Sequence, residues 1–317
     1  MGTGEDARRV IRGRLAPSPT GAQHVGNART YLIAWLSARS RGGELPLRIE
    51  DIDSPRIKQG AAAQILEDLA WVGLDWDGEP IVQSRRLKLY EAALRRLQEQ
   101  ELVYPCTCTR TDVAEAASAP HAGSEGPAYP GTCSHRCAAD AAGLADRPFS
   151  WRLRASGSPA FVDGYRGPIQ LEPAGDFVVW KSAGTPAYQL AVVVDDAAMG
   201  ITEVVRGDDL IPSTPRQLML YEALGLAPPR FVHVPLVVGP DGRRLAKRHG
   251  DTRLAALRHA GVKPESLVGL LARSCGWLAK PEPIRAVDLL PLFRLDAIPP
   301  HPFVLTPELL RGIGYTP

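Results

Sequence analysis

The N-terminal part of the chain alternates strand and helix patterns with short connections, and this alternation limits the folds open to it. Arg12–Ala16 is predicted to be a strand that ends in a run of turn residues, Ala28–Ala38 a helix, and Leu45–Ile49 a second strand. Amphipathic helices are predicted at Ala61–Val72 and Leu87–Leu97. Strand, helix and strand joined by short connections are typical of a parallel sheet with right-handed crossovers. We therefore expect an α/β fold.

The middle of the chain departs from this pattern. Residues 105–150 are rich in Ala, Gly, Pro, Ser and Cys and show little periodicity, so we interpret them as an insertion that is either functional or held in place by a further interaction. Beyond Gly250 we expect short helices, broken by prolines at 264, 281 and 283. Between these parts a helix is predicted at about 215–224, and strands are predicted at Phe177–Trp180, Tyr188–Val194, Ile201–Val205 and Phe231–Val238.

Composition narrows the class of protein. The chain has 317 residues, of which 44% are hydrophobic and 23% charged, and its formal net charge is +2. These values suit a globular protein with a sizeable core and exclude a disordered chain, a fibrous repeat and a strongly basic nucleic-acid coat. A local basic face would still be enough to bind a nucleic acid. Residues 1–10 lack the apolar core of a secretory signal, and no apolar stretch reaches membrane-spanning length. A cytoplasmic protein is expected.

The loop from Pro17 to Asn27 lies between the first predicted strand and helix. Such a turn presents unpaired backbone N–H groups and the positive end of the helix dipole, which suit an anion. His24 could donate a hydrogen bond to a phosphate, and Gly26 lacks a Cβ that would keep a planar base away. The residue types alone fit a plain strand-to-helix turn with a surface histidine about equally well. The spacing of a P-loop is absent.

Two further segments carry dense charge. The run from Arg48 to Asp53 places three carboxylates at a strand end, where α/β folds bind ligands and where they could hold an ammonium group or a metal. From Gly239 to Lys263 seven Lys and Arg face two Asp, a local net charge of 7 − 2 = +5, which suits a phosphate in transfer. An acidic turn and a basic surface loop, both simply solvated, are the alternatives.

Four of the five cysteines lie between 106 and 137. Thiolates in this number fit tetrahedral zinc, and a structural metal would hold an insertion that has no periodic pattern of its own. Free cysteines are the alternative, and C-x-C is tighter than the usual zinc spacing. Cys275 stands apart and is predicted to be a buried apolar residue. The residues in or near the cluster that could be metal ligands are Cys106, Cys108, Tyr129, Cys133, His135 and Cys137.

Taken together, these segments resemble a class I aminoacyl-tRNA synthetase. His24-Val25-Gly26-Asn27 looks like the HIGH element of that class, with Asn in place of the last His. Arg244-Leu245-Ala246-Lys247-Arg248 looks like its KMSKS element, with Arg for the first Lys and Ala for the Ser. The longer runs at 14–21, 48–53, 188–196, 201–210 and 213–217 resemble the glutamyl branch. The resemblance covers about residues 12–275. It implies a Rossmann-like parallel sheet with a zinc-containing insertion and a short helical C-terminal region.

The resemblance also implies a substrate and a chemistry. The glutamate carboxylate would attack the α-phosphorus of ATP, with Mg²⁺ expected alongside, so that the enzyme positions the reactants and neutralises charge. Arg14 and Arg206 would each offer a planar fork to a carboxylate, and Glu50 would take the ammonium group. The implied glutamate site is Arg14, Ala16, Ser18, Glu50, Tyr188 and Arg206. The implied ATP and catalytic residues are His24, Gly26, Asn27 and Lys247.

Length separates relatives within the branch. About 67 residues follow Gly250, too few for a stem-contact region and a full anticodon-binding domain. The shorter form resembles the glutamyl-Q tRNA(Asp) synthetase family, which activates glutamate without tRNA. That family transfers the glutamate to the cyclopentenediol of queuosine in the anticodon of tRNA(Asp). A truncated enzyme that charges another acceptor and a non-catalytic tRNA-binding paralogue are the alternatives.

The same resemblance implies a zinc set and a division of the chain. Zinc would be held by Cys106, Cys108, Tyr129 and Cys133, with His135 and Cys137 as rivals for the fourth position. We expect a monomer that does not bind membranes. Its parts would be the first half of the catalytic domain at 1–104, the zinc-binding insertion at 105–176, the second catalytic half at 177–250 and a helical stem-contact-like region at 251–317, without an anticodon-binding domain.

Overall fold

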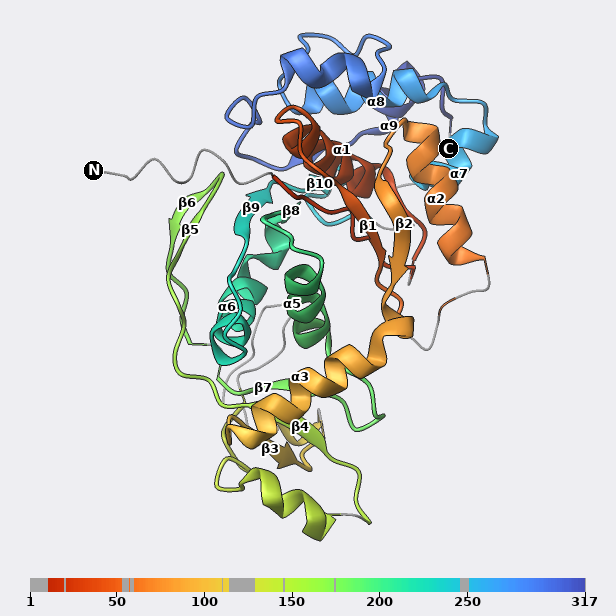
Figure 1. Cartoon of the computed structure of the whole chain (residues 1–317). Coiled ribbons are helices and arrows are strands. Elements are labelled where there is room, and N and C mark those ends of the chain that lie inside the picture. The colour runs from red at the N-terminus through yellow and green to blue at the C-terminus, as the bar shows by residue number, and fades with distance from the viewer. Residues whose placement is uncertain are drawn as a thin grey trace, which may run out of the picture.

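The structure is a computed structural model of the chain (Figure 1). It describes residues 11–19, 21–52, 57, 60–109, 111–113, 129–144, 146–173, 175–245 and 251–316. Lys247 and Asp53, both named in the sequence motifs, lie outside the described residues. No helix within those ranges is long and apolar enough to cross a membrane.

Two pairs of parallel strands form the middle of the molecule. β1 (Pro46–Ile49) pairs with β2 (Asp77–Val82), and β8 (Glu203–Gly207) pairs with β9 (Arg230–Val234). Every residue of β1 and β8 is buried, as expected for strands that are covered on both faces. The α/β class is confirmed.

The segment between these two pairs is less regular than predicted. Leu15 forms a parallel bridge with Leu47 of β1, and the carbonyl of Arg12 accepts a hydrogen bond from the Thr202 N–H at 2.9 Å, just before β8. The N–H of Arg12, however, donates to the Thr202 hydroxyl at 2.8 Å and not to a backbone carbonyl. Backbone hydrogen bonds do connect residues 11–17 with residues 44–50, so the strand predicted at Arg12–Ala16 pairs on that side, as isolated parallel bridges, and is irregular only toward β8.

Helices from both ends of the sequence share one core with these strands. α1 (Val25–Arg39) and α2 (Ala61–Val72) lie near α7 (Leu254–His259) and α8 (Pro264–Ser274), as Figure 1 shows. The prediction of short helices after Gly250 is confirmed. Pro264 does not break a helix but begins α8, a position where its missing N–H leaves no hydrogen bond unmade. α9 (Pro307–Gly312) and the short parallel pair β10 (Val237–Val238) and β11 (Phe303–Val304) complete this part.

A second core lies below the parallel strands in Figure 1. α3 (Leu87–Glu99) and α6 (Thr214–Ala223) pack there with an antiparallel sheet of order β3–β4–β7, at Val103–Cys106, Ser150–Leu153 and Phe177–Trp180. The antiparallel hairpin of β5 (Phe161–Asp163) and β6 (Gly167–Ile169) extends from this region back along β9. The segment predicted to be an insertion thus contains strands as well as loops.

One predicted strand is wrong. Tyr188–Val194 is the beginning of the helix α5 (Tyr188–Ala198), in which all residues from Gln189 to Asp196 are buried. A helix buried on every side shows no apolar periodicity, and its consecutive valines favour a strand when local sequence alone is considered. The prediction at Phe231–Val238 is partly right, because the strand divides into β9 and β10 at Pro235.

Candidate active site and metal centre

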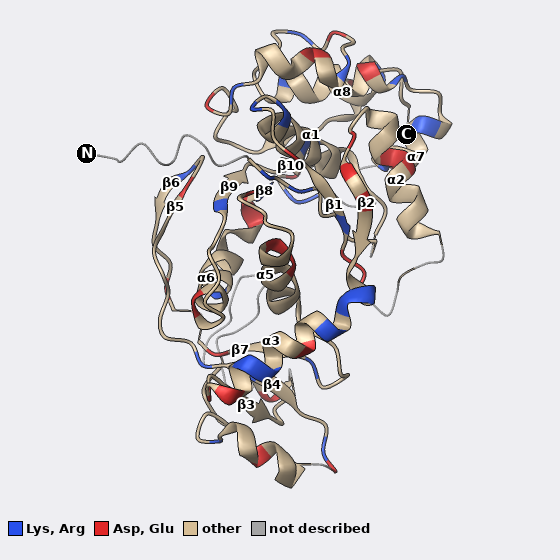
Figure 2. Ribbon diagram, viewed as in Figure 1, with Lys and Arg blue, Asp and Glu red and all other residues tan. Residues whose placement is uncertain are grey.

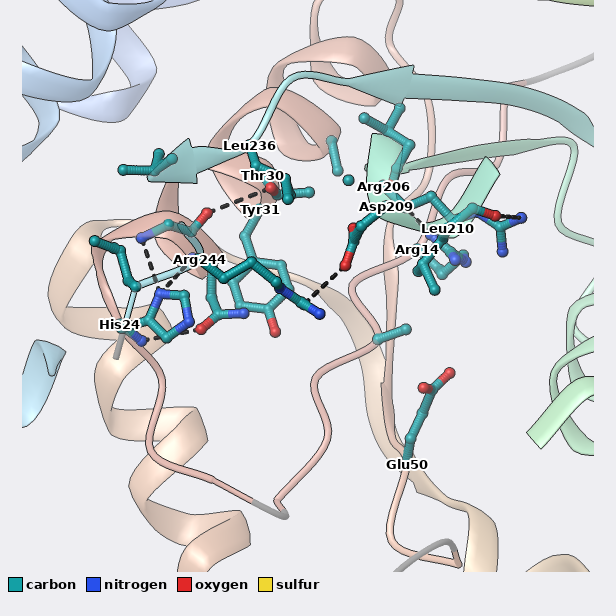
Figure 3. A pocket seen from close by; sticks show the side chains of 18 of the residues that line it. Arg14, His24, Thr30, Tyr31, Glu50, Arg206, Asp209, Leu210, Leu236 and Arg244 are labelled. Atoms are coloured by element: carbon teal, nitrogen blue, oxygen red, sulfur yellow. Dashed lines mark hydrogen bonds and ion pairs between the residues drawn. The ribbon is translucent and has the colours of Figure 1, made fainter. Parts of the chain in front are cut away.

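A cavity of about 400 Å³ lies where the N-terminus of α1 meets the carboxyl ends of β1 and β8. Figure 3 shows side chains from these elements facing one another across it. Eight of the residues implied by the synthetase resemblance line it, and they come from five separate segments of the chain. They are Arg14, Ala16, His24, Gly26, Asn27, Glu50, Tyr188 and Arg206.

Ser18 is not among the residues that line this cavity. Its hydroxyl donates to the carbonyl of Glu50 at 3.2 Å, and the N–H of Glu50 donates to the carbonyl of Pro17 at 3.0 Å. Ser18 therefore ties the turn after the first segment to the end of β1, next to the cavity wall. Lys247 cannot be placed, since residues 246–250 are outside the described ranges.

His24 caps α1 and is held as a neutral imidazole. Its Nδ1 accepts hydrogen bonds from the backbone N–H groups of Gly26 and Asn27 at 3.1 and 3.4 Å, and the Asn27 side chain accepts from the His24 N–H at 3.1 Å. Burial, and then the nearby charge of Arg244, lowers the pKa of His24 to about 4. The ring proton is thus on Nε2, which remains available as a donor. The Asn that replaces the last His of HIGH completes a capping box.

Gly26 has a local role beside the ring of His24. A Cβ on this residue would lie 3.0 Å from Cε1 and 3.1 Å from Nδ1 of His24. A larger residue would push the imidazole away from the helix N-terminus. The absence of a Cβ at Gly26 therefore allows the His24 ring to lie against the helix N-terminus.

A buried network of charges forms the wall behind Glu50. Arg48 has no exposed surface, and it donates to Oε1 of Glu50 at 2.8 Å and to Asp196 at 2.5 Å. Burial raises the pKa of Glu50, while Arg48 and Arg14 oppose this rise. Both hydrogen bonds from Arg48 end on Oε1, and Figure 3 shows the Glu50 carboxylate directed toward the cavity. Glu50 is thus held by Arg48 and is not simply solvated, and among the described residues it belongs to no metal cluster.

The helix α5 supplies the anions of this wall. Asp196 also lies 3.5 Å from the Nε atom of Arg14. This Nε atom has no hydrogen-bond partner among the described residues. Asp195 accepts from Arg86 at 2.7 Å, just before α3. Figure 2 shows acidic residues on α5 and basic residues at the beginning of α3. The misread helix therefore positions part of the site.

Arg206 differs from the other buried arginines near the cavity. It is 4% exposed, and its hydrogen bonds go to neutral acceptors: Nε2 of His233 at 2.9 Å, Oε1 of Gln217 at 2.9 Å and Oγ1 of Thr214 at 2.8 Å. Among the described residues it forms no ion pair with a carboxylate. Burial lowers the pKa of the guanidinium, which records the cost of holding this charge without a counter-ion. A ligand carboxylate would supply that counter-ion.

Sequence reasoning missed several lining residues. Thr30 and Tyr31 follow Asn27 on the same face of α1, so the helical spacing of polar residues could have indicated them. Asp209 forms an ion pair with Arg244 at 2.7 Å across the cavity, as Figure 3 shows. No local pattern indicated that Asp209 lines the cavity, because its ion-pair partner Arg244 is distant in the sequence.

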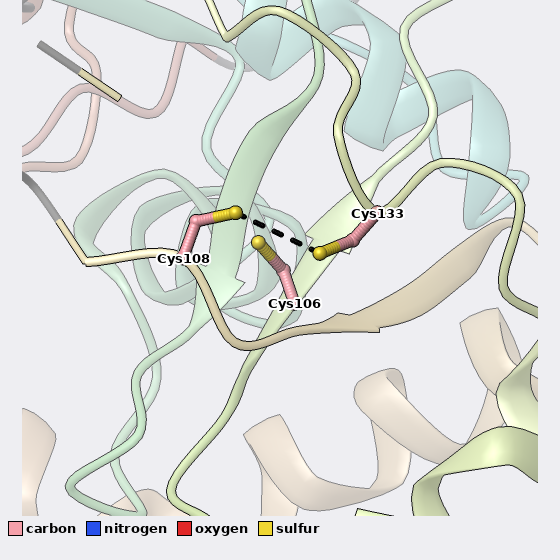
Figure 4. Close-up of side chains that lie close together, drawn as sticks. All are labelled: Cys106, Cys108 and Cys133. Carbon is pink, nitrogen blue, oxygen red and sulfur yellow. Dashed lines mark hydrogen bonds between the residues drawn. The ribbon is translucent and has the colours of Figure 1, made fainter. Parts of the chain in front are cut away.

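Three cysteines come together in the lower part of the molecule. The Sγ atoms of Cys106, Cys108 and Cys133 lie within 4.8 Å of one another (Figure 4), with 3.7 Å between Cys108 and Cys133. The hydroxyl of Tyr129 lies 3.4 Å from Sγ of Cys106 and 3.6 Å from Sγ of Cys108. Zinc at its usual bond lengths would hold tetrahedral sulfur ligands about 3.8 Å apart and sulfur and oxygen about 3.5 Å apart. The donor set therefore fits zinc.

The two rival ligands are not part of this group. His135 and Cys137 are exposed, and neither belongs to the cluster. Tyr129 is buried, and its hydroxyl accepts the Cys133 N–H at 2.8 Å. Cys275, as predicted, is buried and far from the cluster in a different core.

One arginine lies against the cysteine cluster. Nε of Arg152 donates to Sγ of Cys106 at 3.2 Å, and its guanidinium carbon lies 3.8 Å from the centre of the Tyr129 ring. Arg154 is its neighbour two positions along, but its guanidinium lies over Tyr104 and donates to backbone carbonyls. Arg152 is thus a cation in direct contact with a candidate ligand.

Comparisons with known proteins identify the relatives of this chain. The family model described as tRNA synthetases class I (E and Q), catalytic domain, matches residues 10–286. A glutamyl-Q tRNA(Asp) synthetase of Rhodopirellula baltica is 54% identical over 83% of this chain and 84% of its own length. One of Symbiobacterium thermophilum is 49% identical over 96% and 99%. A glutamate–tRNA ligase of Geobacter sulfurreducens is 44% identical over 96% of this chain and 66% of its own length.

Solved structures support the same fold. A glutamate–tRNA synthetase from Elizabethkingia anophelis superposes with a TM-score of 0.82 at 26% identity, covering 96% of this chain and 70% of that one. A glutamate–tRNA ligase from Elizabethkingia meningosepticum, solved with its amino acid, gives 0.81 at 26% identity.

Proposed function

Because the chain belongs to the glutamyl-Q tRNA(Asp) synthetase family, within the class I synthetases for glutamate and glutamine, we propose that it activates glutamate and transfers it to queuosine in tRNA(Asp). Family membership makes it an enzyme of the ligase type. The details of the two steps are our inference. The observation that carries them is Arg206, a buried cation at the wall of the cavity that has no carboxylate partner among the described residues.

In the first step, the two arginines of the cavity would receive the glutamate carboxylates. Arg206 and Arg14 are both nearly buried, so charge-assisted hydrogen bonds from either guanidinium to a carboxylate would be strong. The ammonium group would bind Oε2 of Glu50, because Arg48 occupies Oε1. Tyr188 begins α5 at the cavity and would pack beside the substrate. Ala16 leaves room for it.

ATP would bind at the N-terminus of α1, with Mg²⁺ accompanying the phosphates. An oxygen of the substrate carboxylate attacks the α-phosphorus, the bond to the β-phosphate breaks, and glutamyl-adenylate and pyrophosphate form. His24 would donate its Nε2–H to a phosphate oxygen, aided by the helix dipole above Gly26 and Asn27. Lys247 would add positive charge from the KMSKS-like element.

In the second step, a hydroxyl of the cyclopentenediol attacks the carbonyl carbon of the adenylate. An ester forms and AMP leaves. The acceptor hydroxyl belongs to the queuosine in the anticodon of tRNA(Asp). In this assignment the catalytic halves are 1–104 and 177–250, the insertion between them is 105–176, and 251–317 is a helical stem-contact-like region.

We assign zinc a structural role in this insertion. Cys106, Cys108, Tyr129 and Cys133 would hold it, and the distances among their ligand atoms support this set. The site is separate from the glutamate cavity, because none of these residues lines that cavity.

The test is a pair of assays on the purified protein. We expect glutamate-dependent exchange of pyrophosphate into ATP without tRNA, and no exchange with glutamine. We then expect labelled glutamate on tRNA(Asp) that carries queuosine and none on tRNA(Asp) without it. Labelling of tRNA(Glu) at its 3′ end would identify a truncated charging enzyme instead. Absence of exchange at saturating glutamate would identify a non-catalytic tRNA-binding protein.

A further inference from the structure

One side chain of the β5–β6 hairpin reaches the strand behind the active-site cavity. Asp163 ends β5 and is 2% exposed. Its Oδ2 atom lies 2.7 Å from Nδ1 of His233 on β9, and its Oδ1 atom accepts the N–H groups of Tyr165 and Arg166 at 3.0 and 2.8 Å. The N–H of Gly164 donates to the carbonyl of Phe231 at 2.8 Å. The hairpin is thus fixed along β9 by its backbone.

His233 connects Asp163 with Arg206 at the wall of the cavity. The imidazole has no exposed surface. Because Nδ1 donates its proton to Asp163, Nε2 carries a lone pair, and it accepts the Nε–H of Arg206 at 2.9 Å. Burial lowers the pKa of His233 although Asp163 opposes this, so the ring is neutral near pH 7. Asp163, His233 and Arg206 therefore form one chain of hydrogen bonds from the hairpin to the cavity.

We propose that Asp163 and His233 are positioning residues for Arg206, which fix its guanidinium so that it receives a substrate carboxylate. This inference rests on the proposed function. Neither residue lines the cavity, and both act through Arg206. The hairpin, which belongs to the segment between the catalytic halves, would thereby contribute to glutamate binding.

The neutral ring between the two charges has a physical reason. An aspartate directly against Arg206 would neutralise it and compete with the substrate carboxylate. An imidazole offers an acceptor that orients the guanidinium without such competition, while Asp163 keeps the negative charge one side chain away. Arg206 thus stays buried and in place, yet its charge remains open to a ligand.

The substitution Asp163→Asn tests this with little change in shape. The backbone donors of Tyr165 and Arg166 require an oxygen, so the amide NH₂ of the variant would face Nδ1 of His233. His233 would then carry its proton on Nε2, opposite the Nε–H of Arg206, and the orienting bond would be lost. We expect the KM for glutamate in the exchange assay to rise about tenfold or more. The KM for ATP should stay within about twofold.

The matched control lies in the same hairpin. Arg166 donates to Asp208 at 2.6 Å and to the carbonyl of Pro300 at 3.0 Å, and its side chain is not part of the chain to Arg206. Arg166→Ala should leave the KM for glutamate near that of the parent protein. An equal rise in both variants, or no rise in Asp163→Asn, would overturn the proposal, because the hairpin would then act only as a scaffold or not at all.

A double-mutant cycle with Arg206 gives a second readout. Lysine at 206 has no Nε–H for His233, so Asp163→Asn should add less than about twofold to the KM for glutamate in an Arg206→Lys background. Additive effects would overturn the proposal. If Asp163→Asn fails to fold, His233→Gln and His233→Leu replace it. The glutamine amide can still accept from Arg206 and should retain glutamate binding, whereas the leucine should lose it; equal binding by both would contradict the positioning role.

Failure of the proposed function is distinguishable from failure of this inference. A parent protein that shows neither glutamate-dependent exchange nor a glutamate-induced rise in melting temperature would overturn both. A parent protein that shows exchange, with the variants unchanged, would overturn only the role of Asp163 and His233.

Discussion

At the scale of single residues, the buried arginines of this protein are distinguished by their partners. Arg48 is surrounded by carboxylates and closes a network within the protein. Arg206 has only neutral acceptors among the described residues and is ready for a ligand. Arg152 has a sulfur and an aromatic ring as partners. All three are the same residue type in the sequence, so their roles follow from their surroundings.

The surroundings of Arg152 predict a role in zinc binding. Three thiolates and a phenolate would carry four negative charges against two on Zn²⁺, so a cation beside them stabilises the loaded site. We expect Arg152→Gln to weaken zinc affinity about 10- to 100-fold, measured by competition with a chromophoric chelator. Arg154→Gln is the control, because Arg154 contacts Tyr104 and backbone carbonyls instead. Equal weakening in both variants would show a general loss of folding.

At the scale of elements, one residue of α1 combines a structural task with the catalytic task that we propose for it. His24 caps the helix through Nδ1 and presents Nε2 to the cavity. The cap requires the neutral ring, because a protonated Nδ1 cannot accept the N–H groups of Gly26 and Asn27. The stability of this helix end should therefore depend on pH.

The pKa of His24 fixes the direction of that dependence. Its pKa is about 4 in the folded protein, against 6.5 for an unperturbed histidine, so the unfolded chain binds more protons between these values. The contribution of His24 to stability is present above pH 6.5 and is lost as the pH falls toward 4. We expect urea unfolding to show this slope for the parent protein, and His24→Gln to reduce it. Identical slopes in the two proteins would contradict a cap made by the neutral ring.

Elements also show where prediction from sequence succeeded. The bounds of α2 agree with its amphipathic pattern, and α3 extends its predicted helix by only two residues. The pattern is clear because each has one buried and one exposed face. The local sequence of α5 favours a strand because the helix is buried all round, and the segment at 12–15 is irregular toward β8 because the Thr202 side chain accepts one of its backbone hydrogen bonds.

At the scale of the whole molecule, the C-terminal region is part of the core that supports the cavity. Leu305, Leu310 and Tyr315 are buried in the same core as Leu15 and Leu32. β11 pairs with β10, and Val237 of β10 lines the cavity. The end of the described chain therefore stabilises the wall of the site.

This arrangement predicts the effect of a single truncation of a side chain. Leu310 is 1% exposed, so Leu310→Ala should lower the free energy of unfolding by about 2–5 kcal/mol, with the exchange activity lost at a lower temperature. Val304→Ala is the control, since Val304 is 42% exposed, and we expect a change within about 0.5 kcal/mol. Chemical denaturation of both variants measures this. A small effect at Leu310 would contradict its packing in the shared core.

The sequence by itself determined the α/β class, most of the helices and the residue types of both sites, because turn residues, amphipathic spacing and C-x-C are local signals. It could not determine which charges are satisfied within the protein. That Glu50 binds Arg48, that Ser18 supports a turn and that Tyr129 rather than His135 lies with the cysteines depends on contacts between distant segments. The tertiary structure decided these points, because the partner of a buried polar group is chosen by packing and not by neighbours in the chain.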